Sequence, residues 1–247
     1  MNVEELSRQF DSDFAYSTAM SFDNVGHLIG DKGAQVQSVL LAVDVTHDVI
    51  KEVALQNCNV IVTHHPVIFH PLKSIYQGSI AYDLIQKNIS VISLHTNLDL
   101  AVGGVNDCLA AALNLQQVCQ LGEDGLGRVG TLPQPMTAEQ LAGYVKQQLH
   151  APCVRFNNGS VPISKIAVGG GACGDLWELA MQMGCDALVS GEAKYNEFVD
   201  AQNAGFTLLA AGHYATEWVV LPMLQKYLTQ LGVKAIISST KDIESAV

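Results

Sequence analysis

The chain has 247 residues, of which 49% are hydrophobic and 15% are charged. This composition is sufficient to bury a core, in one large α/β unit or in two compact ones. Lysine and arginine total 13 against 24 aspartates and glutamates, and the resulting net charge of −11 argues against non-specific nucleic-acid binding. An anionic substrate therefore needs a local positive centre.

The N-terminal segment and the cysteines both indicate a cytoplasmic protein. MNVEELSRQF has no basic start followed by an apolar stretch, and no apolar run approaches the roughly 18 residues that span a bilayer. We therefore expect no membrane association. The six cysteines are scattered and form no CxxC pair. They are typical of small buried residues in a reducing compartment, rather than of a disulfide framework or a thiolate metal site.

The first part of the chain alternates between strands and helices. Residues 3–10 predict a short helix, and FDNVGHLIGDKG predicts a turn-rich loop. HTNLDLAVGGVND predicts another loop, which leads into a helix over 106–115. Between the two loops we expect strands over 39–45, 59–63 and 89–94 and helices over 47–56 and 79–87. This alternation is typical of βαβ units and of a mainly parallel or mixed sheet with helices on both faces.

The second part of the chain repeats this alternation after a junction. Residues 116–130 predict a loop, and Thr137 and Gln140 match a capping box that opens a helix to about residue 150. Pro222 predicts a kink or a late start in the last helix. The other expected elements are strands over 166–168, 186–190 and 206–211 and helices over 175–183 and 216–231.

An internal repeat indicates a duplicated fold. Shifting the chain by 127 residues places IAVGGGACGDLWELAMQMGCDALVSGE on VLLAVDVTHDVIKEVALQNCNVIVTHH without a gap. With a slightly different offset, SVISLHTNLD lies on TLLAAGHYATE. Few identities survive, and βαβ units look alike at low identity, so coincidence is an alternative. We predict two α/β halves, residues 1–122 and 123–247, with one composite site between them.

Histidines and carboxylates follow the predicted strands in both halves. His64 and His65 end the apolar run CNVIVTHHPVIF, at the edge where open α/β sheets bind their ligands. The spacing His-x-x-x-carboxylate then occurs twice, as His95 with Asp99 and as His213 with Glu217. If a helix begins at His213, its i, i+4 spacing places both side chains on one face.

These six residues are candidates for a catalytic metal site. Imidazoles and carboxylates without thiolates suit Zn, Fe, Mn, Co or Ni, and five or six such ligands favour two ions rather than one. The alternative is structural. A histidine at a strand end is commonly hydrogen-bonded, and an i, i+4 His and Glu pair is commonly a solvated helix interaction.

Two further features allow other interpretations. The run Gly169–Gly174 contains GxGxxG between a strand and a helix, which is a dinucleotide-binding pattern or a tight turn with little room for side chains. The aligned turn of the first half has no such glycines, which favours the tight turn. Lys194 follows the next strand, and either supplies positive charge to a substrate anion or is solvated.

Several motifs, in their order along the chain, resemble one known family. They are DNVGHLIGD, THHPVIFHPLKSI, HTNLDLAVGGVND, GRVGTL, SGEAKYNEF and GHYATE. They resemble the YbgI-like proteins, also called the Ngg-one-interacting-factor-three family and often named GTP cyclohydrolase 1 type 2 homologs. The resemblance covers residues 23–217. Relatives often have GD and then KYH where this chain has Gly191, Glu192 and KYN, which puts a catalytic role of that loop in doubt.

The resemblance implies a two-part α/β fold with a dinuclear metal centre, assembled as a homohexamer. It implies the metal ligands His64, His65, Asp99, His213 and Glu217, with His95 beside the metals. We expect a metal-dependent hydrolase that acts on a small molecule such as a nucleotide, in which His95 or Glu217 moves protons. The alternatives are a metal-delivery or metal-storage protein without turnover, and a structural or regulatory scaffold.

Overall fold

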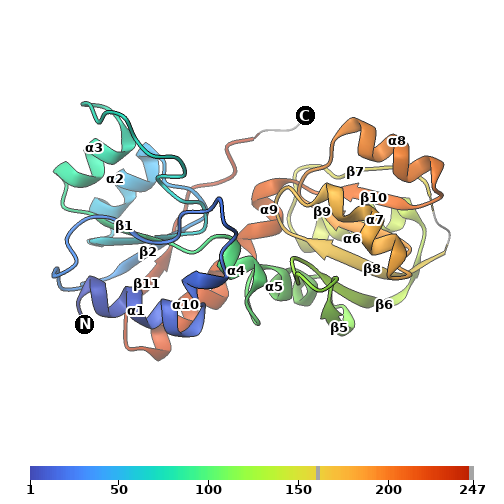
Figure 1. Cartoon of the computed structure of the whole chain (residues 1–247), viewed down its shortest axis with the longest axis horizontal. Helices are drawn as coiled ribbons and strands as arrows, with labels where there is room; N and C mark the ends of the chain where they lie inside the picture. The colour runs from blue at the N-terminus through green and yellow to red at the C-terminus, as the bar shows by residue number, and fades with distance from the viewer. Residues whose placement is uncertain (160–161, 245–247) are drawn as a thin grey trace. The chain divides into compact units, whose positions relative to one another are not determined.

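A computed structural model of the chain describes residues 1–159 and 162–244. Within it the chain forms two compact units: unit 1 holds residues 1–101 and 221–241, and unit 2 holds residues 102–220 and the C-terminal residues from 242. Each unit contains its own mixed β-sheet and its own helices (Figure 1). The predicted α/β fold class is confirmed. The division into halves 1–122 and 123–247 stays a prediction.

Unit 1 is built on a five-stranded sheet with the strand order β1-β4-β3-β2-β11. β2, β3, β4 and β11 are parallel, and β1 is antiparallel to β4. All four positions of β3 are buried, as expected for a continuous β-branched run in the middle of a sheet. The bounds are β1 (Gly26–Ile29), β2 (Val39–Ala42), β3 (Val60–Thr63), β4 (Ser90–Ser93) and β11 (Ala235–Ile237).

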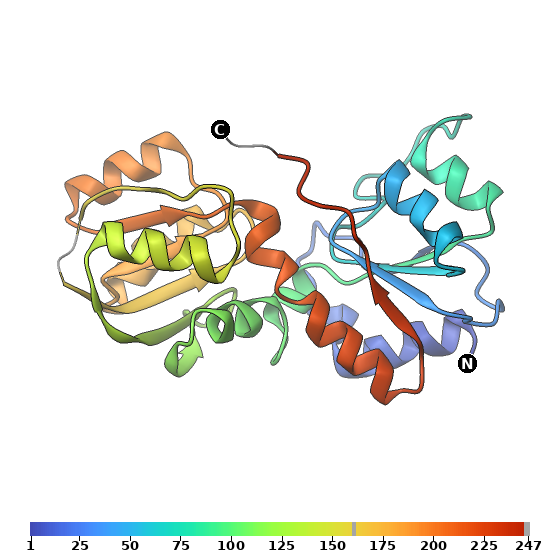
Figure 2. The same ribbon diagram turned by 180° about the vertical axis from the view of Figure 1, so that it is seen from behind.

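Helices cover both faces of the unit 1 sheet. α2 and α3 pack on one face, where Val53 and Leu84 join a core that includes Ile61. α1 and α10 lie on the other face (Figure 2). The rings of Phe10 and Tyr227 stack between them with their centroids 5.5 Å apart. The helix bounds are α1 (Val3–Asp13), α2 (His47–Leu55), α3 (Ile80–Gln86), α4 (Thr96–Leu100) and α10 (Leu221–Gln230), with a 3₁₀ turn at Tyr16–Thr18.

Unit 2 is built on a six-stranded sheet with the strand order β5-β6-β8-β9-β10-β7. β8, β9 and β10 are parallel, and the other three strands are antiparallel to their neighbours. Its strands are β5 (Gln116–Gln120), β6 (Arg128–Met136), β7 (Arg155–Phe156), β8 (Ile163–Gly169), β9 (Ala187–Ser190) and β10 (Thr207–Ala210). Its helices are α5 (Val105–Ala112), α6 (Ala138–Gln148), α7 (Trp177–Gln182), α8 (Tyr195–Asn203) and α9 (His213–Trp218), with a 3₁₀ turn at Gly174–Leu176.

Alternate side chains of these parallel strands enter two separate cores. Val189 packs with α5 and α6 on one face, and its neighbour Leu188 packs with α7 and α8 on the other. This is the two-sided burial that a strand of a parallel sheet requires. The capping box predicted at Thr137 and Gln140 is present at the start of α6.

The strand pairing repeats at the shift found in the sequence. In unit 1, Val39 of β2 is in register with Val60 of β3. In unit 2, Ile166 of β8 is in register with Ala187 of β9, and both of these residues lie 127 positions after their unit 1 counterparts. β4 and β10 then occupy equivalent places, each between the second strand of its repeat and an antiparallel strand. The parallel cores of the two units therefore share one topology.

Three predicted loops are wrong in part. FDNVGHLIGDKG contains β1, residues 116–130 contain β5 and the start of β6, and HTNLDLAVGGVND contains the short helix α4. β5 is exposed at all five positions, so it lacks the hydrophobic alternation that marks a half-buried strand. The late helix start at Pro222 is confirmed: α9 ends at Trp218, and α10 begins at Leu221, which places Pro222 in its first turn.

Within residues 1–159 and 162–244, every helix is too short or too polar to traverse a lipid bilayer.

A buried carboxylate ties the C-terminal part of unit 1 to α2. Glu52 accepts hydrogen bonds from the Ser238 hydroxyl, at 2.5 Å, and from the Ser239 backbone N–H, at 2.9 Å. Burial raises the pKa of Glu52, but these hydrogen bonds outweigh it, and the pKa is lowered from its ordinary value. The ionised carboxylate therefore stabilises the attachment of the segment that follows β11.

Replacing Glu52 by glutamine is expected to lower the unfolding free energy at pH 7 by about 1–2 kcal/mol, because charge-assisted hydrogen bonds are lost. A carboxylate whose pKa is lowered by folding stabilises the folded state at pH values above its unfolded pKa of about 4.3. This contribution to the unfolding free energy is lost as the pH falls through the folded pKa. Urea unfolding at pH 7 and at pH 3 measures both effects. The difference between wild type and Glu52→Gln should shrink toward pH 3, and a constant difference would contradict this account.

Candidate metal centre

His64 and His65 lie directly after β3, and the sheet holds them in place. Their backbone N–H groups donate to the carbonyls of Ala42 and Val43, so pairing with the β2 segment continues past β3 until Pro66. The His64 side chain is fully buried, and that of His65 is 26% exposed. Because side chains alternate along an extended backbone, the two imidazoles leave it in different directions.

His95 joins these two histidines from the end of the neighbouring strand. It follows β4 and is the N-cap residue of α4. The His64 and His95 ring centroids are 5.2 Å apart, and those of His65 and His95 are 5.7 Å apart. One nitrogen of each of the three rings lies within 4.8 Å of the others. The carboxyl ends of β3 and β4 thus gather three imidazoles, as the sequence predicts.

Each of these imidazoles has its Nδ1 held by an acceptor. The Leu94 carbonyl holds His64 at 2.8 Å, Asp44 holds His65 at 2.8 Å, and Asp23 holds His95 at 2.9 Å. Carbonyls and carboxylates only accept, so Nδ1 carries the proton and the lone pair lies on Nε2. This arrangement prepares neutral histidines to ligate through Nε2.

Asp23 is the most strongly anchored of these acceptors. It also accepts from the Thr96 hydroxyl at 2.5 Å and from the Thr96 backbone N–H at 3.1 Å. Burial raises the pKa of Asp23, but the hydrogen bonds from His95 and Thr96 outweigh it and lower the pKa to about 2. Asp23 is therefore ionised at neutral pH and fixes both His95 and the start of α4.

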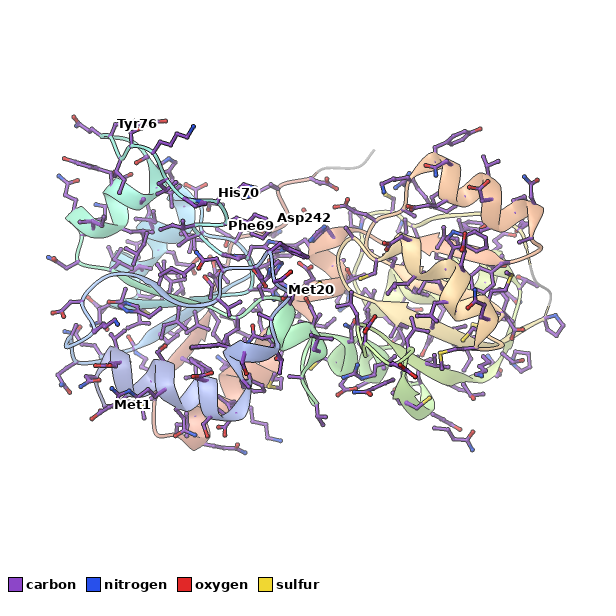
Figure 3. The ribbon with its side chains drawn as sticks, viewed as in Figure 1. Met1, Met20, Phe69, His70, Tyr76 and Asp242 are labelled. Atoms are coloured by element: carbon purple, nitrogen blue, oxygen red, sulfur yellow. The ribbon has the colours of Figure 1, made fainter. Side chains whose placement is uncertain are left out.

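Asp99 adds a carboxylate to the unit 1 group. It lies on α4, is 9% exposed, and has its Oδ1 3.7 Å from Nε2 of His64. Phe69 borders the group on another side, with its ring edge-on to His95 at a centroid distance of 6.1 Å. Figure 3 shows Phe69 beside His70, with Tyr76 farther out in the loop that joins β3 to α3. Unit 1 therefore brings together four of the six predicted site residues.

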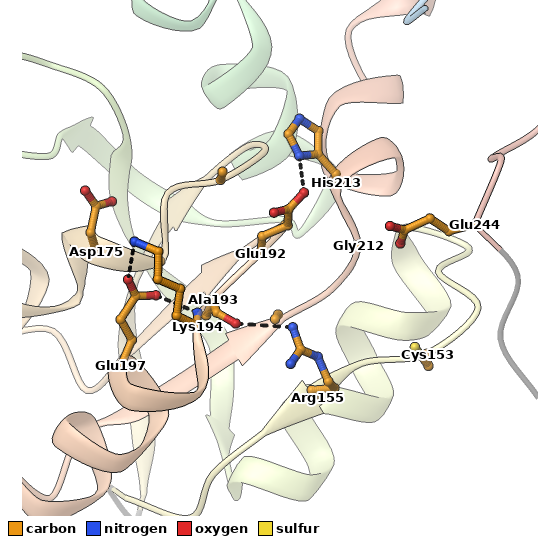
Figure 4. A pocket seen from close by; sticks show the side chains of 14 residues that line it. Cys153, Arg155, Asp175, Glu192, Ala193, Lys194, Glu197, Gly212, His213 and Glu244 are labelled. Carbon is orange, nitrogen blue, oxygen red and sulfur yellow. Dashed lines mark hydrogen bonds and ion pairs between the residues drawn. The ribbon is translucent and has the colours of Figure 1, made fainter.

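Unit 2 brings together the other two. α9 begins at His213, as the motif predicts, and its first turn places His213 Nε2 3.0 Å from Glu217 Oε1. Glu217 is buried, at 4% exposed. His213 Nδ1 is held by Glu192 at 2.6 Å, which repeats the imidazole–carboxylate pairing of unit 1 (Figure 4). In the 127-residue shift, Glu192 corresponds to His65.

The glycine-rich run 169–174 makes space for these two side chains. A Cβ on Gly171 would collide with Glu217 Oε1 and would lie 3.1 Å from His213 Nε2, and the positive φ of Gly171, +64°, also disfavours a side chain. A Cβ on Gly170 would lie 3.6 Å from Cγ of Glu217. The glycines therefore have a role in packing around His213 and Glu217, as in the tight-turn interpretation.

Asp23, Asp44 and Glu192 are the site residues that the sequence analysis missed. Asp44 and Glu192 each follow a strand, and Asp23 lies within the quoted motif DNVGHLIGD. An acidic residue at a strand end was the only available signal, because their histidine partners lie 21 to 72 positions away.

Fold and site together define a class: an α/β protein of two units whose strand ends present oriented histidines and carboxylates of the metal-ligand type. Comparison with known families agrees. Residues 1–243 match the family model described as Duf34/NIF3 (NGG1p interacting factor 3), and the chain belongs to this family.

Relatives of known name and structure cover nearly the whole chain. It is 32% identical over 240 residues to a protein of Clostridium acetobutylicum named GTP cyclohydrolase 1 type 2 homolog, with 92% of this chain and 90% of the relative covered. The crystal structure of Staphylococcus aureus hypothetical protein SA1388 is similar, with a TM-score of 0.93, 28% identity, and 100% and 99% of the two chains covered. A Bacillus cereus protein described as related to NIF3 has a TM-score of 0.92, 25% identity, and 100% and 99% covered.

Proposed function

We propose that the protein is a metal-dependent hydrolase with two divalent ions per subunit, drawn from Zn, Fe, Mn, Co and Ni. The proposed ligands are His64, His65 and Asp99 of unit 1 and His213 and Glu217 of unit 2. The proposed catalytic residues are His95 and Glu217.

The orientation of the histidines is the observation that carries this proposal. Nδ1 is held by a carbonyl or a carboxylate in the three proposed ligands His64, His65 and His213, which leaves Nε2 as the ligating atom. His95 is held in the same way, by Asp23. Metal-binding histidines almost always have such a partner, which fixes the tautomer and raises ligand basicity. A donor set of imidazoles and carboxylates without thiolate suits a catalytic site rather than a structural one.

His95 and Glu217 are suited to move protons. Asp23 holds Nδ1 of His95, so the opposite edge of the ring is directed toward His64 and His65. Glu217 is a buried carboxylate one helical turn from His213. Divalent ions, when bound, lower the pKa of water and polarise a substrate oxygen. His95 can then accept or return a proton at Nε2 while Asp23 keeps its ring in place.

The name of the relatives supports a nucleotide-like substrate, and GTP is the first compound to test. A nucleotide is an anion, so its binding requires compensation for the net charge of −11. The homohexameric assembly implied by the sequence motifs and a cytoplasmic location belong to the same proposal.

Elemental analysis of protein purified without added metal tests the proposed centre. We expect about two divalent ions per wild-type chain and a loss of most of this metal in His64→Ala and in His65→Ala, because each removes a ligand. His65 is partly exposed, so its replacement is tolerated by the fold even if that of the buried His64 is not.

His47→Ala is the matched control, since His47 is half-exposed at the start of α2 and lies outside the proposed ligand set. It should retain the wild-type metal content. A metal content near zero in the wild type would refute the centre. Metal-loaded protein that hydrolyses neither GTP nor other nucleotides, yet transfers its metal to an apo-acceptor, would replace the hydrolase proposal with metal delivery.

A further inference from the structure

Unit 2 contains a pocket of about 390 Å³ beside His213 (Figure 4). Its lining is unusually rich in charged groups for a small cavity. Two cations, Arg155 and Lys194, face it together with four carboxylates, those of Asp175, Glu192, Glu197 and Glu244. The charge that this pocket offers to a ligand depends on which of these groups already neutralise each other.

Lys194 has a carboxylate partner of its own. Its Nζ lies 3.5 Å from Oε1 of Glu197, and its backbone N–H donates to Oε2 of the same carboxylate at 2.8 Å, at the start of α8. The Glu197 side chain is only 10% exposed, so this arrangement is part of the helix start. The charge of Lys194, whose side chain is 78% exposed, is therefore shared with Glu197 and screened by water.

Arg155 is exposed and has two contacts, neither of them with a carboxylate. One guanidinium nitrogen donates to the Ala193 carbonyl at 3.3 Å, and the guanidinium carbon lies 5.5 Å from the centre of the Phe198 ring. Within the described part of the chain, Arg155 makes no ion pair. These two contacts restrict its rotamers but leave most of its five N–H donors and its whole charge for another partner.

The sheet places Arg155 close to the end of β10. Arg155 is in β7 and is in register with Ala210 of β10, three residues before His213. Glu192, on the adjacent strand end, accepts from Nδ1 of His213, so its carboxylate is directed at the imidazole and not at the guanidinium. Among the described residues, Arg155 is thus the cation of this largely acidic pocket that has no ion pair, and it lies at the same end of the sheet as the histidine.

We propose that Arg155 is a specificity-determining residue that binds a phosphate group of the substrate in this pocket, beside His213. A guanidinium presents paired N–H donors that match a phosphate, and one held by neighbouring contacts loses little freedom on binding. This inference rests on the proposed function for the identity of the substrate, but it concerns only residues of unit 2.

Binding measurements on four proteins test the role of Arg155. Wild type, Arg155→Ala, Arg155→Lys and Lys194→Ala are titrated calorimetrically with GTP, tripolyphosphate, guanosine and succinate, and the metal content of each sample is determined. We expect Arg155→Ala to weaken GTP and tripolyphosphate binding about tenfold to hundredfold and to leave guanosine unchanged, because only phosphate contacts are lost. Arg155→Lys should restore part of the affinity.

Lys194→Ala is the matched control, because it removes a cation of the same pocket that is already paired. It should change the affinity for tripolyphosphate by less than about threefold, since exposed ion pairs contribute little. Equal losses in Arg155→Ala and Lys194→Ala would overturn the proposal in favour of a general charge effect. Unchanged binding in Arg155→Ala would also overturn it and would mean that Arg155 only lines the wall of the pocket.

The remaining outcomes separate this inference from the proposed function. Arg155-dependent binding of succinate but not of tripolyphosphate would refute the phosphate assignment. If tripolyphosphate binding depends on Arg155 in a protein that contains no metal, the role of Arg155 in phosphate binding is supported and the proposed metal centre is refuted. If the metal content is complete and Arg155→Ala does not change phosphate binding, the metal centre is supported and the role of Arg155 is refuted.

Discussion

Replacing Arg128 by alanine is expected to lower the unfolding free energy of unit 2 by about 3 kcal/mol. Arg128 lies at the start of β6 and is 2% exposed. Its guanidinium pairs with the Asp107 carboxylate of α5 and donates to the carbonyls of Gly125 and Gly127, at 2.8 and 2.9 Å. The alanine variant leaves these acceptors without their donor, and an acceptor that loses its partner in a buried position keeps its full desolvation cost.

Arg8→Ala provides the comparison for this effect. Arg8 also pairs with one carboxylate, Glu4, at 2.7 Å, but its side chain is 75% exposed. We expect a loss of less than about 0.5 kcal/mol, because an exposed i, i+4 ion pair is screened by water. Urea unfolding followed by far-UV circular dichroism, which reports on both units, measures both variants. Similar shifts of the two midpoints would show that the buried network of Arg128 does not hold β6 to α5.

The parallel core of each unit could be predicted from the sequence because it leaves two independent signals. β2, β3 and β4 are buried at every position, so their continuous apolar runs stand out from the helices between them. The shift of 127 residues then gave the topology of unit 2, and the register of Val39 with Val60 recurs as that of Ile166 with Ala187.

The strands outside these cores could not be predicted, for a physical reason. β1, β5, β7 and β11 lie at the outer positions of the two sheets, and β7 has only two residues. Their identity comes from backbone pairing with a strand far away in the sequence, as when β11 joins β2. Neither propensity nor periodicity records such pairing, because tertiary contacts decide it.

The candidate site was predictable in its histidines but not in the groups that orient them. The sequence shows polar residues at the ends of apolar strands, namely His64, His65 and His95. Asp23 is 72 positions from His95, and it reaches this histidine only because β1 pairs with β4. The carboxylates that fix the tautomers therefore became visible only with the fold. The sequence left two interpretations of Lys194, and its pairing with Glu197 became visible only with the fold.

Replacing Gly171 by alanine is expected to reduce metal affinity at least about tenfold while the chain stays folded. The added methyl group would occupy the space of Glu217 Oε1 and would press on His213 Nε2. The backbone there, at φ +64°, cannot relax cheaply, because β8 precedes it and its carbonyl accepts from the Glu192 N–H. Glu217 must therefore turn away from His213. Dialysis against a competing chelator, followed by elemental analysis, gives the affinity.

Gly205→Ala separates loss of ligand geometry from simple backbone strain. Gly205 follows α8 in the same unit and has a similar φ of +72°, but a Cβ there would meet no atom within 4 Å. Both variants bear the cost of about 1 kcal/mol for a left-handed alanine. Gly171→Ala also bears the cost of displacing Glu217, so its melting temperature should fall further. Only Gly171→Ala should lose metal, because only there does the methyl group displace a carboxylate. Equal metal content in the two variants would remove Glu217 from the ligand set and would leave the glycine run as an ordinary turn.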